Sequence, residues 1–73
     1  MKTKELIKAI ELFQKRYLEK IKEGNPTVCV MAIGYLECFE VFARELNDDE
    51  ILEIIANLQV IVSLAGIGVC LND

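Results

Sequence analysis

Apolar residues recur every three or four positions along the first third of the chain, and charged residues fill the positions between them. The spacing four, three, four, four joins Leu6, Ile10, Phe13, Tyr17 and Ile21. One apolar stripe of this period is the pattern of an amphipathic helix that packs one face into a core. The pattern predicts a helix over residues 4–23, with Thr3 as its N-cap.

A second helix is predicted over residues 26–46, directly after a clear helix-breaking signal. Gly24 suits the left-handed position that ends a helix, Asn25 suits an N-cap, and Pro26 suits a first turn that needs no backbone N–H. A connection this short makes the two helices an antiparallel pair. The main apolar stripe of the second helix is Val28, Ala32, Tyr35, Leu36, Phe39, Phe42 and Leu46.

A third helix is predicted over residues 48–65, or to residue 71 if it continues past Gly66. Asn47 as N-cap, with Glu50 three residues later, resembles a capping box. One stripe of this helix is expected to face the core: Ile51, Ile54 or Ile55, Leu58, Val62, Ala65 and Val69. Three helices with short connections predict an all-α, up-down-up bundle in which residues 1–73 form a single domain.

The last third of the chain has more apolar surface than one core requires. Residues 54–71 contain no charged side chain, and a second stripe lies opposite the first. The first half of the second helix is also apolar on all sides, and Gly34 there costs about 1 kcal/mol relative to alanine, which suggests a close backbone neighbour. These features predict an interface made of Val30, Ile33, Gly34, Val60, Leu64, Ile67 and Leu71.

Composition supports association with another chain. Of the 73 residues, 53% are hydrophobic, and a domain of this size is only marginally stable alone. We therefore expect oligomerisation to complete the bundle, as a homodimer or with a helical protein partner. The net charge is −4, and the basic residues concentrate in residues 1–23. An acidic balance disfavours general nucleic-acid binding.

The chain lacks the residues that most enzymatic and metal sites use. It contains no histidine, and Cys29, Cys38 and Cys70 have no paired spacing, so histidine-based catalysis is excluded and a structural zinc site nearly so. The carboxylate pairs Glu37/Glu40 and Glu50/Glu53 fall on faces expected to be solvated. We expect no catalytic residue, no cofactor and no metal. Three unpaired thiols suit a reducing compartment, which predicts a cytoplasmic protein.

Together these patterns predict a small non-enzymatic interaction module. It would act as an adaptor or an occluding inhibitor, of the kind that phages and plasmids encode. Two alternatives remain open. One is a dimeric nucleic-acid-binding regulator that uses the basic face of the first helix. The other is a membrane-associated protein that inserts residues 54–71, although polar Asn57, Gln59 and Ser63 oppose insertion.

Overall fold

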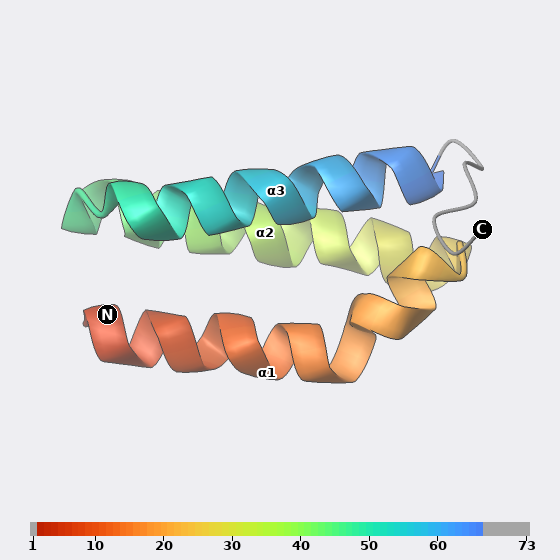
Figure 1. The fold of residues 1–73 in the computed structure, drawn as a ribbon, viewed down its shortest axis with the longest axis horizontal. Helices are drawn as coiled ribbons and strands as arrows, with labels where there is room; N and C mark the ends of the chain where they lie inside the picture. The colour runs from red at the N-terminus through yellow and green to blue at the C-terminus, as the bar shows by residue number, and fades with distance from the viewer. Residues whose placement is uncertain (1, 67–73) are drawn as a thin grey trace.

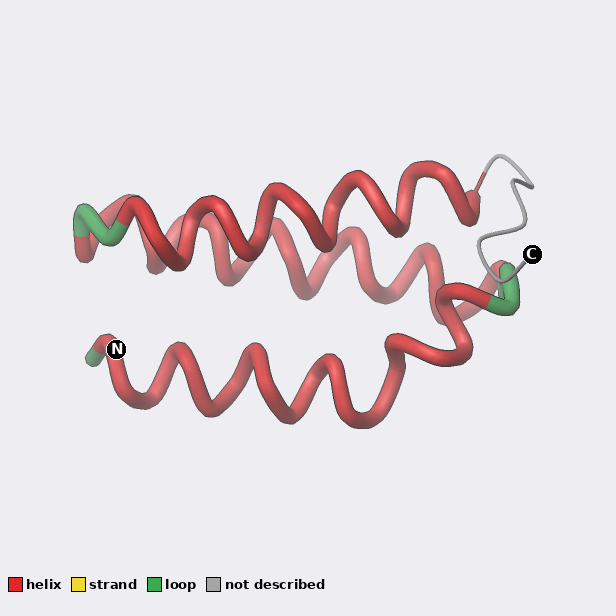
Figure 2. Tube along the Cα trace, viewed as in Figure 1, coloured by secondary structure: helices red, strands yellow, loops and turns green. Residues whose placement is uncertain are grey.

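A computed structural model describes residues 2–66, which form three packed α-helices. They are α1 (Thr3–Lys22), α2 (Pro26–Leu46) and α3 (Asp49–Gly66). The helices lie alongside one another, and the two short connections lie at opposite ends of the molecule (Figures 1 and 2). No strand occurs within residues 2–66. This part of the chain is therefore an all-α three-helix bundle, as the periodicity predicts.

The core runs along the length of the bundle and receives side chains from all three helices. Its largest fully buried side chains are Leu6, Ile21, Leu36 and Ile55. Burying one such side chain contributes about 1.5–3 kcal/mol to folding. On α3, Ile55 takes the core position and its neighbour Ile54 stays exposed. The buried set is Leu6, Ile10, Phe13, Ile21, Cys29, Ala32, Leu36, Phe39, Ala43, Ile51, Ile55, Leu58, Val62 and Ala65.

The first connection has the geometry that its sequence predicts. Gly24 has a φ of 79°, in the left-handed region that a glycine adopts without steric cost. The amide of Gly24 donates to the Ile21 carbonyl at 2.9 Å, and that of Asn25 donates to the Lys20 carbonyl at 3.1 Å. The Asn25 side chain then accepts a hydrogen bond from the Val28 amide at 3.1 Å. The same three residues thus end α1 and begin α2.

The second connection differs from the prediction by one residue. Asn47 ends α2 in the left-handed conformation, with a φ of 53°, and its amide donates to the Arg44 carbonyl at 3.1 Å. Asp48 is the N-cap of α3, because its Oδ1 accepts the Ile51 amide at 3.1 Å. The prediction of Asn47 as N-cap is therefore wrong. Asparagine tolerates the left-handed region and aspartate caps equally well, so each residue satisfies a different helix end.

The helix bounds differ slightly from the predicted ones at two other points. Thr3 lies in the first turn of α1 and is not its N-cap, because the Leu6 amide already donates to the Lys2 carbonyl at 3.0 Å. The helix α3 reaches Gly66. The predicted extension to residue 71 lies outside the described residues, as do Ile67, Val69, Cys70 and Leu71.

Candidate interaction surface

Large apolar side chains remain exposed on all three helices, but their surroundings differ. Residues 26–36 of α2 and 54–66 of α3 carry no charged side chain. Val30 is 71% exposed and Ile33 is 51% exposed on the first segment, and Val60 is 58% exposed on the second. The full set of exposed large apolar residues in the described chain is Ile7, Leu12, Val30, Ile33, Tyr35, Val41, Ile54 and Val60.

The two uncharged segments meet at a shallow groove of about 250 Å³ between α2 and α3. Val30 lies one turn before Ile33 on α2, and Val60 lies one turn before Ser63 on α3. We call Val30, Ile33, Val60 and this groove the aliphatic surface. The groove itself is lined by Ile33, Leu36, Glu37, Gln59, Val62 and Ser63.

The interface residues predicted from the sequence occupy different environments. Gly34 is exposed, and, apart from its chain neighbours and the adjacent backbone of α2, no described atom lies within 4 Å of the position that a Cβ would occupy. The close backbone neighbour suggested by the glycine is therefore not supplied by the described part of this chain. Leu64 is half-buried, so it offers less surface than Val60. Ile67 and Leu71 lie outside the described residues.

A polar cluster marks one end of the aliphatic surface. Gln59 Nε2 donates to Glu40 Oε1 at 3.0 Å, which links α3 to α2. Arg44 Nε donates to Glu40 Oε2 at 3.1 Å, and the same two residues form the only ion pair within residues 2–66. The hydrogen bonds from Gln59 and then Arg44 hold the pKa of Glu40 below its ordinary value of 4.5. Beyond this cluster the outer faces of α2 and α3 become acidic.

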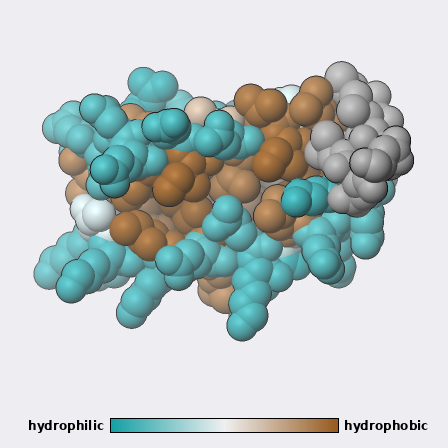
Figure 3. All heavy atoms as spheres, viewed as in Figure 1, coloured by the Kyte–Doolittle hydropathy of each residue, from teal (hydrophilic) through white to brown (hydrophobic). Residues whose placement is uncertain are grey.

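A second seam, between α1 and α3, is also apolar. A groove of about 280 Å³ is lined by Ile7, Ile10, Glu11, Gln14, Ile51 and Ile54. Figure 3 shows apolar side chains gathered along the middle of the viewed face, with polar residues below them and, on the left, above them. Two of the six residues that line this groove, Glu11 and Gln14, are polar, against three of the six that line the groove between α2 and α3. The two grooves differ instead in the exposed residues beside them, because only the α2–α3 groove lies on segments that carry Val30 and Val60.

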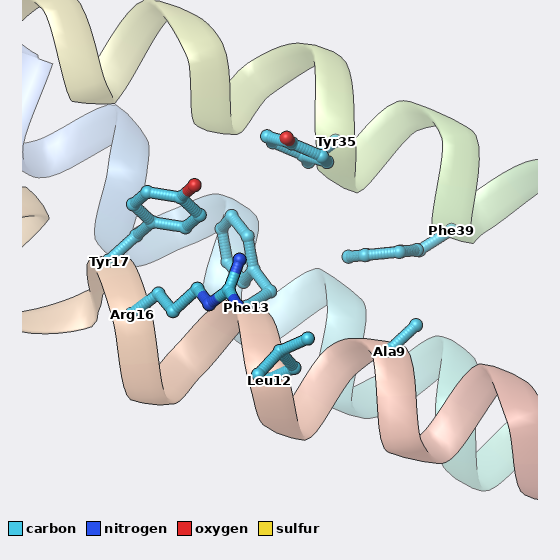
Figure 4. A pocket seen from close by; sticks show the side chains of 7 residues that line it. All are labelled: Ala9, Leu12, Phe13, Arg16, Tyr17, Tyr35 and Phe39. Carbon is cyan, nitrogen blue, oxygen red and sulfur yellow. The ribbon is translucent and has the colours of Figure 1, made fainter.

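The third seam, between α1 and α2, is aromatic, and sequence reasoning did not identify it as a site. An opening there, which we call the aromatic pocket, is lined by Ala9, Leu12, Phe13, Arg16, Tyr17, Tyr35 and Phe39 (Figure 4). The sequence does carry a signal for it. Phe13 and Tyr17 are four residues apart, and so are Tyr35 and Phe39, which places each pair on one helix face.

Cysteines and acidic residues form no metal site in the described part of the chain. No group of three or more histidine, cysteine, aspartate or glutamate residues between 2 and 66 could hold a metal ion. Cys29 is buried, with its Sγ 3.9 Å from the Ile21 carbonyl oxygen, and Cys38 is exposed. Cys29 therefore occupies a packing position in the core.

Within residues 2–66 one helix, α2, is long and apolar enough to cross a membrane. The segment 54–71 predicted from the sequence extends beyond the described residues. The core helix of a bundle can have the same length and composition. Five side chains of α2 are buried against the other helices: Cys29, Ala32, Leu36, Phe39 and Ala43. This property therefore does not distinguish a membrane-spanning helix from a bundle helix.

No protein-family model, curated protein or solved structure matches this chain.

Proposed function

We propose that this protein is a non-enzymatic helical interaction module that associates through the aliphatic surface. Its three helices form an up-down-up bundle, and a second copy of the chain covers the surface. The observation that carries the proposal is the exposure of Val30, Ile33 and Val60 on two adjoining segments that have no charge. In its cell the module would act as an adaptor or an occluding inhibitor in the cytoplasm.

The physical basis of the proposal is the difference between isolated and contiguous apolar surface. Single exposed aliphatic residues are common on soluble proteins. A contiguous apolar surface rimmed by polar residues is typical of an interaction site. Here exposed Val30 and Ile33 on α2 and Val60 on α3 belong to the two helices that line one groove, whose polar residues are Glu37, Gln59 and Ser63. A helical partner that packs there would bury the groove and both flanking valines.

Gly34 adds a second argument for a helical partner. It lies on the uncharged segment of α2, one residue after Ile33, and has open space where a side chain would be. A helix interior that keeps a glycine gives up about 1 kcal/mol relative to alanine. Small residues permit close approach of a second helix backbone, so a helix docked over Gly34 would account for that cost.

Sedimentation equilibrium tests the proposal with a matched pair of variants. Val60→Glu places a charge on the aliphatic surface. Val41→Glu makes the same change at a valine of nearly equal exposure, 57% against 58%, among the carboxylates of the acidic end. We expect wild type and Val41→Glu to form dimers at low micromolar concentration and Val60→Glu to be monomeric. A monomeric wild type would refute self-association, and equal behaviour of the two variants would refute the assignment of the surface.

The charge of α1 supports a second candidate, a nucleic-acid-binding regulator. Between Thr3 and Lys22 there are six basic and three acidic side chains, whereas α2 and α3 are both net acidic. Basic side chains that neutralise nucleic-acid phosphates release bound counterions, so the affinity falls steeply as the salt concentration rises. Two results would favour the regulator. The protein would bind duplex DNA or RNA with an affinity that falls as salt is added. That binding would be lost when Lys15, Arg16 and Lys20 are changed to glutamate.

A further inference from the structure

Four of the five aromatic residues in the chain converge on the aromatic pocket. Phe13 is 3% exposed and forms its floor. The ring of Phe13 lies 5.8 Å from those of Tyr17 and Tyr35 and 5.9 Å from that of Phe39, in tilted and edge-on arrangements. Tyr35 stacks with Tyr17 at 6.0 Å and with Phe39 at 6.3 Å. The walls of the opening are therefore ring faces and edges.

The opening is large enough for a small ring and is open on one side. Its volume is about 200 Å³, and a cavity of about 150 Å³ suffices for benzene. Ala9 leaves the space on the α1 side, because its side chain ends at Cβ. A planar aromatic group gains both apolar burial and edge-to-face contacts against such walls, whereas an aliphatic group gains only the burial.

The charge at the pocket selects an anion. Arg16 is the only charged residue that lines the opening, and Figure 4 shows its side chain among those that surround the pocket. Within residues 2–66 no carboxylate pairs with Arg16, because the single ion pair there joins Arg44 and Glu40. A guanidinium presents a planar set of donors that matches a carboxylate.

From this combination we infer that the aromatic pocket binds a small aromatic carboxylate, with the ring against Phe13 and the tyrosines and the carboxylate on Arg16. The site lies between α1 and α2, away from the aliphatic surface between α2 and α3. It is therefore independent of the proposed self-association. It would give the module a ligand-binding site in addition to its interaction surface.

Tyrosine fluorescence reports directly on this pocket. The chain has no tryptophan, and its two tyrosines, Tyr17 and Tyr35, both line the opening. The probe is phenylpropanoate, with neutral phenylpropanol and cationic phenylpropylamine as comparison compounds of similar size. We expect a saturable change in tyrosine emission, with phenylpropanoate binding about twofold to fivefold more tightly than phenylpropanol, the range that one exposed charge pair gives.

Charge reversal on α1 sharpens the test without disturbing the core. Arg16→Glu should reverse the order of affinity, so that phenylpropylamine binds more tightly than phenylpropanoate. Lys15→Glu is the matched control, because Lys15 is the exposed neighbour that does not line the pocket. Ala9→Leu should fill the opening and weaken binding of all three compounds about tenfold or more, since the ring loses its burial.

Four outcomes would overturn the inference. The first is equal binding of the three compounds to wild type. The second is an equal change in preference with Lys15→Glu and Arg16→Glu. The third is unaltered binding by Ala9→Leu that retains its helical circular dichroism. The fourth is nuclear magnetic resonance shifts that centre on Val30 and Val60 rather than on Tyr17 and Tyr35.

Discussion

The two ends of the α2–α3 pair have the same kind of interior and opposite kinds of surface. At one end, residues 26–36 and 54–66 carry no charge; at the other, residues 37–53 carry seven carboxylates and one arginine. Buried apolar residues continue through both ends, from Ala32 and Val62 to Ala43 and Ile51. The core therefore does not require the outer surface to be apolar at either end.

The comparison shows why exposed apolar residues have to be judged with their neighbours. Val41 is as exposed as Val60, but Glu37 and Glu45 lie one turn away from it on either side. A valine among carboxylates stays hydrated and has no contiguous apolar area to offer. Val60 instead directly follows Gln59, which lines the same groove as Ile33. At the uncharged end, no carboxylate lies one turn from Val30 or Val60 along its helix, which favours a partner surface there.

The largest difference between two variants is expected for one substitution in the interior and one on the surface of the uncharged end. Leu58 is 4% exposed and Val60 is 58% exposed, two residues apart on α3. Leu58→Glu should unfold the domain, since an unpaired buried charge costs several kcal/mol. Val60→Glu should keep its helical circular dichroism and lose only self-association. If both variants unfold, the assignment of Val60 to the outer surface is wrong.

The next effect compares the two connections, one at each end. Gly24→Val forces a branched side chain into the left-handed region and should cost about 1–2 kcal/mol. At the other connection Asn47 already occupies that region, so Asn47→Gly should stabilise the fold, by less than about 1 kcal/mol. Urea denaturation measures both. A Gly24→Val variant as stable as wild type would show that α1 does not end at this residue.

A smaller effect separates the isolated chain from its complex. Gly34→Ala should raise the stability of the monomer by up to about 1 kcal/mol, because a helix favours alanine and the new Cβ would meet no described atom beyond the adjacent backbone of α2. If a second helix packs over Gly34, the same change should weaken self-association. Denaturation of Gly34→Ala in the monomeric Val60→Glu background measures the change in monomer stability. Sedimentation of Gly34→Ala alone measures the change in self-association. Unchanged association would remove Gly34 from the interface.

The smallest effect concerns the polar cluster where the two ends meet. Hydrogen bonds from Gln59 and Arg44 lower the pKa of Glu40 in the folded protein. The ionised Glu40 side chain therefore stabilises the fold fully above its ordinary pKa of 4.5. This stabilisation is lost as the pH falls through the lowered pKa of the folded protein. Glu40→Gln should be less stable than wild type near neutral pH and should converge with it in acid. A difference that does not depend on pH would contradict this.

Much of the fold follows from local signals in the sequence. The spacing of Leu6, Ile10 and Phe13 defines the buried face of α1, and the Gly24-Asn25-Pro26 run defines the first connection. The second connection was misplaced because Asn47 and Asp48 are both good caps and both tolerate irregular backbone. Local preference cannot decide which residue takes which role, since the packing of α2 on α3 sets the register.

The candidate sites were less predictable, because they depend on which helix faces which. A helical period identifies Val60 as lying off the core stripe, but it does not reveal that Leu64 is half-buried while Val30 is exposed. The aromatic pocket could not be predicted without the relative rotation of α1 and α2, because that rotation brings Phe13 against Tyr35 and Phe39. In the sequence those rings look like ordinary core residues.

The most direct test of the interaction surface is a dilution series followed by methyl nuclear magnetic resonance on the wild-type protein. Signals from Val30, Ile33 and Val60 should shift together as the dimer dissociates, while those of Val41 and Ile54 should stay constant. Shifts confined to Val41 and Ile54, or a monomeric mass with no shift at any concentration, would contradict this expectation.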